Sequence, residues 1–141
     1  MLHHSTAIAV ILVSTISLSP QDDVKALTGN WLVASAELSG EALPEKATST
    51  MRLNIAGDKY AFTEGKSLDR GDLKIDATKK PKEMDIIGVE GPNKGKTYLA
   101  IYELKGDTLR ICYDLGGKSR PSEFATKKGA ALFLVTYQRM K

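Results

Sequence analysis

The sequence has very few of the residues that most catalytic and metal sites need. Its two histidines, His3 and His4, stand at the extreme N-terminus, and Cys112 is the single cysteine among 141 residues. Histidine-based triads, histidine general bases and histidine-containing metal sites are therefore excluded once that end is set aside. One cysteine forms neither an internal disulfide nor a CxxC motif, and without a histidine to activate it we expect Cys112 to be structural.

Excess charge and aromatic side chains are also scarce. The chain has 20 Lys and Arg against 17 Asp and Glu, a net charge of +3, which is too mild to indicate a nucleic-acid partner. Lysine pairs such as Lys79–Lys80 are typical of solvated loops. With one Trp, five Tyr and three Phe, a large aromatic-lined pocket is not expected. We predict no metal and no cofactor.

The N-terminal twenty residues form a separate segment. Residues 7–18 are mostly apolar, and no Lys, Arg, Asp or Glu precedes Asp22. Such a run is shorter than the roughly twenty residues that a membrane-spanning helix needs, and it fits the core of a secretory signal peptide. We expect residues 1–20 to be a signal peptide and residues 21–141 a secreted, periplasmic or envelope domain with no membrane span. An uncleaved hydrophobic anchor is the alternative.

The remaining chain has the pattern of short strands separated by turns. Met51, Leu53 and Ile55 alternate with polar residues, which is typical of a strand with one buried face. Gly71 within its run predicts a bulge or bend. Helical candidates are short, around residues 22–27 or 41–47. The predicted strands are residues 31–38, 51–57, 59–63, 68–75, 84–89, 97–104, 108–114, 121–126 and 131–137.

These eight or nine strands are joined by short connections, which favour antiparallel neighbours in chain order. A meander of this size closes most simply into a barrel, because closure removes both exposed sheet edges. We therefore predict an all-β fold, an eight- to nine-stranded antiparallel up-and-down barrel. The interior of such a barrel is wide enough for side chains or for one small ligand.

Two apparent motifs do not carry chemistry. Residues 90–97 end in Gly-Lys-Thr like a phosphate-binding loop, but Gly91 is one residue too close and a predicted strand follows, so we interpret this segment as a turn. Asp69, Asp72 and Asp76 are close in sequence, yet nothing fixes a pair of carboxylates at the separation that glycoside hydrolysis requires. We assign no catalytic residue.

The start of the first strand carries the most informative local signal. Trp31 is placed to plug one end of a small barrel, and Gly29 would allow the close chain approach that such a plug needs. If the chain ends meet, Arg139 is expected to lie over the indole ring. The alternative is a core tryptophan with no further role.

Gly29-x-Trp31 with an Arg near the C-terminus resembles the lipocalin signature. The chain more closely resembles a family of small uncharacterised secreted domains abundant in planctomycete bacteria and described as lipocalin-like. This resemblance implies a lipocalin-like fold and a secreted or envelope setting, but no reaction. Many lipocalins pin the C-terminal segment with a disulfide, which this chain cannot form. The matching residues are Leu27, Gly29 and Trp31 with segments 81–86, 91–97, 101–113 and 120–124.

The function we expect is non-enzymatic binding of a small, mostly apolar ligand inside the barrel. Burial of ligand carbon would supply the affinity, and a few polar groups would orient the ligand. Which residues face inward depends on strand register, since a slip of one residue reverses every side chain. The candidate interior polar residues are Tyr98, Tyr102, Arg110, Tyr113 and Arg120.

Two other functions remain open from the sequence. A solid barrel could serve as an interaction module that presents loops to an envelope protein or a polysaccharide. A lumen packed by Leu, Ile and Phe with an apolar patch outside would favour that module, whereas an open apolar cavity of a few hundred Å³ would favour the ligand binder. An enzyme using carboxylates or tyrosines is the least favoured reading, because no base, nucleophile and oxyanion donors can be assembled.

Overall fold

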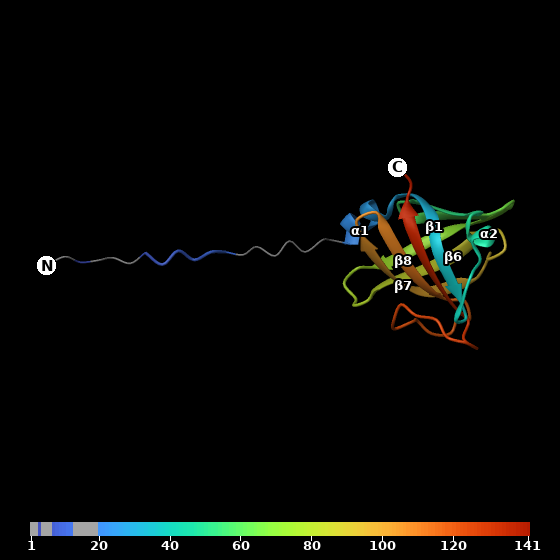
Figure 1. The fold of residues 1–141 in the computed structure, drawn as a ribbon. Coiled ribbons are helices and arrows are strands. Elements are labelled where there is room, and N and C mark those ends of the chain that lie inside the picture. Colours follow the sequence, from blue (N-terminus) through green and yellow to red (C-terminus); the bar gives the residue numbers. More distant parts are fainter. Residues whose placement is uncertain (1–2, 4–6, 13–19) are drawn as a thin grey trace.

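A nine-stranded antiparallel sheet closes on itself through pairing of its first and last long strands, as the computed structural model shows (Figure 1). Consecutive strands are neighbours, and only the short β2 stays outside the closed ring. The predicted up-and-down barrel is therefore confirmed. Its strands are β1 (Gly29–Leu38), β2 (Glu41–Ala42), β3 (Met51–Ala56), β4 (Lys59–Glu64), β5 (Ser67–Asp76), β6 (Lys82–Glu90), β7 (Thr97–Lys105), β8 (Thr108–Asp114) and β9 (Leu132–Arg139).

The structure describes residues 3, 7–12 and 20–141. Most of the predicted signal peptide, including residues 13–19, lies outside the described residues, so its cleavage stays a prediction. Two short helices accompany the barrel, α1 (Pro20–Leu27) and α2 (Glu45–Thr48). They correspond to the two helical candidates, although residues 41–42 pair with β1 as β2. Neither helix in the described part of the chain is long and apolar enough to cross a bilayer.

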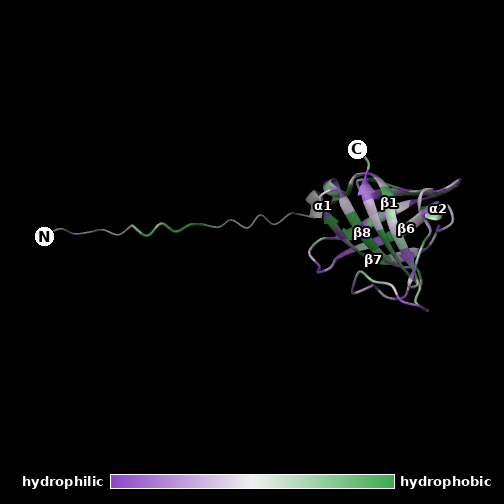
Figure 2. Ribbon diagram, viewed as in Figure 1, coloured by the Kyte–Doolittle hydropathy of each residue, from purple (hydrophilic) through white to green (hydrophobic). Residues whose placement is uncertain are grey.

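Alternation of side chains decides which residues fill the barrel. In β3, Met51, Leu53 and Ile55 are buried, whereas the residues between them are exposed, as the sequence pattern predicts. Figure 2 shows that hydrophobic and hydrophilic residues are mixed along the strands of the barrel. The same period of two is clear in β5 and β6, and the inward-facing residues of all the long strands form one apolar core. Its buried members are Leu27, Trp31, Ala36, Leu53, Ile55, Tyr60, Leu73, Met84, Ile86, Ala100, Tyr102, Leu109, Ile111, Val135 and Tyr137.

The irregularity predicted at Gly71 lies between β5 and β6. Arg70 is opposite Glu90 and Gly71 is opposite Gly88, so Val89 is the extra residue on β6. A Cβ atom on Gly71 would lie 1.9 Å from the carbonyl oxygen of Ile87, which leaves no room for any side chain. The glycine therefore permits the close approach of the two backbones.

The strand predicted over residues 121–126 is wrong. That segment lies within the long connection between β8 and β9 and forms no strand. Pro121 supplies no backbone N–H for a ladder, and the connection instead packs on the outside of β6, β7 and β8. There it lies against Cys112, which is fully buried although it is not part of the core inside the lumen. Ile101, opposite Cys112 on β7, is buried outside that core as well. The Cys112 thiol lies 3.7 Å from the carbonyl oxygen of Ala125, and burial raises its pKa.

Asp114 anchors the start of this outer connection. Its carboxylate accepts hydrogen bonds from the backbone N–H groups of Gly116, Lys118 and Ser119 at 3.0, 2.9 and 2.8 Å. Burial by itself raises the pKa of the Asp114 carboxyl, but these three donors outweigh it and hold the pKa below its ordinary value.

We expect Asp114→Ala to lower the free energy of unfolding at pH 7 by about 2 kcal/mol, because three backbone donors lose their acceptor. The pKa is lower in the folded state than in the unfolded one. The stabilisation is therefore present above the unfolded pKa of about 4 and is lost as pH falls through the folded value. Urea unfolding at pH 7 and pH 3 checks this, with Asp58→Ala at an exposed turn as the control. Equal losses at both pH values would contradict it.

Candidate functional site

One end of the barrel is closed by α1 and the Trp31 side chain. Trp31 is fully buried, and its indole Nε1 donates to the carbonyl oxygen of Leu27, the last residue of α1, at 3.0 Å. The Arg139 guanidinium lies over the indole ring, 4.3 Å from the ring centroid. Its Nη atoms donate to the carbonyl oxygens of Thr28 and Ala26 at 2.9 and 2.6 Å. One cation thus covers the indole and binds carbonyls at the C-terminal end of α1.

Gly29 allows the guanidinium to sit there. Its φ is +152°, and a Cβ atom at this position would lie 2.7 Å from Nη1 of Arg139. The structure therefore brings Gly29, Trp31 and Arg139, the three residues singled out for a barrel plug, to the same end of the barrel. None of these three residues lines the cavity of about 110 Å³ inside the barrel.

A buried polar cluster joins α1 to the barrel wall at the same end. The Asp23 carboxylate, 2% exposed, accepts hydrogen bonds from the Tyr102 hydroxyl at 2.6 Å and from Lys82 Nζ at 2.9 Å. Burial and the Asp23 carboxylate raise the pKa of Tyr102, which stays a neutral donor. Tyr102, one of the predicted ligand-binding residues, faces inward but does not line the cavity: it lies at the packed end, and its hydroxyl is bonded to Asp23.

The lumen beyond the packed end contains a cavity of about 110 Å³. Its walls are mostly aliphatic and aromatic, and several rim residues, among them Phe62, Tyr98 and Phe133, are only partly buried. We call the end of the barrel where these residues lie the mouth. The lining residues are Leu53, Ile55, Tyr60, Phe62, Asp69, Leu73, Met84, Ile86, Asn93, Tyr98, Ile111, Tyr113, Leu115, Phe133 and Tyr137.

A chain of hydrogen bonds crosses one wall of the cavity. Oδ2 of Asp69 accepts from the Tyr60 hydroxyl and from Nδ2 of Asn93, both at 3.0 Å. The Tyr98 hydroxyl in turn donates to Oδ1 of Asn93 at 2.8 Å. Burial, followed by the nearby Asp69 carboxylate, raises the pKa values of Tyr60 and Tyr98, so both phenols are neutral at physiological pH. They act as hydrogen-bonding groups and not as bases.

A second polar pair lies among the apolar residues of the cavity. The hydroxyls of Tyr113 and Tyr137 are 2.8 Å apart, and the Tyr113 ring packs 5.8 Å from that of Phe133. Burial raises the pKa of both tyrosines well above the ordinary value. One hydroxyl uses its proton in the shared bond, and the other keeps its proton for a further acceptor.

Asn93 reaches the cavity because the loop of residues 91–96 folds back over the mouth. The N–H of Gly88 donates to the carbonyl of Lys96, and the N–H of Gly95 donates to the carbonyl of Gly88, each at 2.9 Å. A Cβ atom on Gly88 would lie 1.9 Å from the carbonyl oxygen of Asn93. The missing side chain at Gly88 therefore admits the loop, which was predicted only as a turn.

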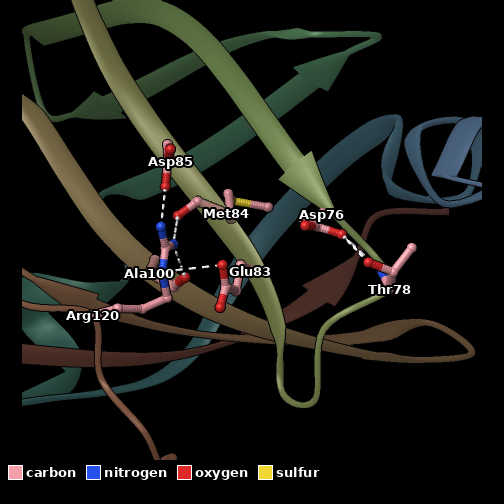
Figure 3. A network of polar contacts seen from close by, with 7 residues as sticks. All are labelled: Asp76, Thr78, Glu83, Met84, Asp85, Ala100 and Arg120. Carbon is pink, nitrogen blue, oxygen red and sulfur yellow. Dashed lines mark hydrogen bonds and ion pairs between the residues drawn. The ribbon is translucent and has the colours of Figure 1, made fainter.

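Arg110 and Arg120 lie outside the barrel, which corrects their expected inward position. Arg110 precedes the inward-facing Ile111, so alternation turns it outward, where it pairs with Glu103 at 3.1 Å and lies over the Phe124 ring at 4.5 Å. Arg120 belongs to the outer connection and binds the wall from outside, donating to Asp85 at 2.6 Å and to the carbonyl of Ala100 at 2.8 Å (Figure 3). Both arginines hold the structure together and neither touches the cavity.

Of the predicted ligand-binding residues, Tyr98 and Tyr113 line the cavity. The sequence reasoning missed Tyr60, Asp69, Asn93 and Tyr137. Asp69 could have been found from the sequence. It is two residues before Gly71 and four before Leu73, so alternation places its carboxylate on the buried face of the strand. Asn93 had none, since its place depends on how the loop folds back.

The residues around the cavity supply apolar surface and hydrogen-bonding groups. Within the described residues, no three His, Cys, Asp or Glu side chains are grouped to hold a metal ion. The cavity offers apolar walls, one buried carboxylate, one amide and four phenols. Comparisons with protein-family models, curated proteins and solved structures find no match to this chain, so its function is inferred from this geometry.

Proposed function

We propose that this protein binds a small, mostly apolar ligand through the mouth of the barrel, without catalysing a reaction. The observation that carries the proposal is the largely apolar cavity that the side chains leave beside a few fixed polar groups, the combination typical of small-molecule sites. The barrel supplies a rigid wall because each of the eight strands of the closed ring is paired on both sides. The polar chain of Tyr60, Asp69, Asn93 and Tyr98 supplies orientation.

The volume of the cavity limits the size of the ligand that it can hold. At about 110 Å³ it is smaller than the few hundred Å³ of a full drug-sized pocket, and smaller than an apolar cavity of about 150 Å³ that accommodates benzene. The buried part of the ligand is thus a short aliphatic group or a small ring. Each buried methylene contributes about 0.8 kcal/mol, so a four-carbon group alone gives millimolar binding at best. Tighter ligands would extend past Leu115 at the mouth.

A cavity-filling substitution tests the proposal. We expect Ile86→Phe to reduce binding of small apolar probes at least tenfold, because the larger side chain occupies part of the cavity. Ile87→Phe is the matched control, since Ile87 follows Ile86 on β6, points to the other face and does not line the cavity. Titration of labelled protein with small alkanols, followed by NMR, gives the affinities. Equal affinity in Ile86→Phe and wild type would contradict binding in the cavity.

Native mass spectrometry of protein purified from its own host complements this test. A co-purified small molecule that is absent from Ile86→Phe would support the proposal and supply the ligand's mass. The secreted or envelope setting is part of the same proposal and rests on the apolar run of residues 7–18. The mass of the purified chain checks it, because signal cleavage would remove about twenty residues.

A further inference from the structure

Asp69 is a buried carboxylate that pairs with no Lys or Arg side chain in the described part of the chain. It is 7% exposed and lines an otherwise largely apolar cavity. Its Oδ2 accepts from Tyr60 and Asn93, whereas its buried Oδ1 has no hydrogen-bond partner among the residues that the structure describes. Among the ion pairs of the described residues, none includes Asp69.

This arrangement contrasts with the other buried carboxylates. Asp23 is paired with Lys82, and Asp114 accepts three backbone N–H groups through both oxygens. Burying a carboxylate is unfavourable unless a cation or a full set of donors compensates for the lost water. Asp69 has donors on one oxygen only, so the structure leaves both a negative charge and an acceptor atom unmatched beside the cavity.

We propose, building on the proposed function, that the ligand is a primary organic amine with a short apolar body. Its ammonium group would donate to Oδ1 of Asp69, and its carbon chain would pack against Leu53, Ile55, Ile86 and Ile111. An ammonium supplies both the missing donor and the missing positive charge, and charge-assisted hydrogen bonds are the stronger kind. A neutral alcohol supplies only the donor, and a carboxylate ligand is repelled.

The test compares three probes with the same four-carbon chain: n-butylamine, n-butanol and butyrate. We expect the full-length protein at pH 7 to bind n-butylamine at least tenfold more tightly than n-butanol, and butyrate not at all. Asp69→Asn keeps the size of the side chain but removes its charge, and should bring the two affinities within about twofold of each other. NMR titration gives all values, and circular dichroism checks the fold of each variant.

Asp72→Asn is the matched control. Asp72 lies on the same strand, but its side chain is 40% exposed, pairs with Lys59 and does not line the cavity, so the preference for the amine should be unchanged. Tyr60→Phe is a second variant that leaves the carboxylate in place and removes one of the two donors to its Oδ2, the other being Asn93, and it should retain the preference.

The outcomes separate this inference from the proposed function. If n-butanol binds as tightly as n-butylamine, or if Asp69→Asn retains the preference, the amine specificity is wrong while the apolar cavity still binds ligand. A Tyr60→Phe protein that is folded but has lost the preference also overturns the specificity. If none of the probes binds at millimolar concentrations, and Ile86→Phe behaves as wild type, the proposed function fails as well.

Discussion

Replacing Trp31 with alanine should cost about 3–5 kcal/mol of unfolding free energy, the largest loss we expect from a single side chain. Trp31 is fully buried, so the substitution leaves a void where a large ring now fills the closed end. The indole also holds Leu27 of α1 by a hydrogen bond and carries Arg139 on its face. All three contributions are lost together, and α1 loses part of its attachment.

Urea unfolding followed by circular dichroism measures this loss, because the variant has no other tryptophan to report by fluorescence. Trp31→Phe is the control. It keeps most of the apolar volume and loses the Nε1 donor, so it should cost only about 1–2 kcal/mol. A loss below about 1 kcal/mol for Trp31→Ala would show that the closed end does not depend on the indole plug.

Replacing Gly88 with alanine should destabilise the protein by about 3 kcal/mol and displace the loop that covers the mouth. The added Cβ would lie 1.9 Å from the carbonyl oxygen and 2.5 Å from the carbonyl carbon of Asn93. Both are backbone atoms, so the loop has to move as a unit. Asn93 then loses its hydrogen bonds to Asp69 and Tyr98, and the cavity becomes more accessible.

Hydrogen exchange of the amides of Gly88 and Gly95, together with urea unfolding, checks this prediction. Gly95→Ala is the matched control in the same loop. Its φ is +81° and nothing lies within 4 Å of an added Cβ, so only the backbone strain of about 1–2 kcal/mol is expected. If Gly88→Ala left the exchange of both amides as slow as in wild type, the close approach of loop and strand would be contradicted.

The fold could be predicted because strand alternation is a local property. The spacing of Met51, Leu53 and Ile55 is enough to predict that they share a buried face, and Gly71 within its strand predicts a bulge. The site was predicted only in part. Tyr98 and Tyr113 could be predicted, because alternation along their strands points both side chains into the lumen. Arg110 has the opposite parity to Tyr113, so the two could not both face inward.

What lay beyond sequence reasoning depends on contacts between distant segments. Arg120 lies in a connection whose sequence shows no alternation of apolar and polar residues. Only the tertiary structure shows that its guanidinium donates to the carbonyl oxygen of Ala100 from outside the barrel wall. Asn93 reaches the mouth because Gly88 on β6 has no side chain and so leaves room for the loop of residues 91–96 to fold back.

The amino-acid order by itself determined the closed antiparallel barrel, since spacing and turn residues act between near neighbours and need no distant partner. Only the tertiary structure decided which end stays hollow and which carboxylate is left without a cation. Both depend on how side chains from many strands pack together in the lumen, and this packing cannot be deduced from any single segment of the chain.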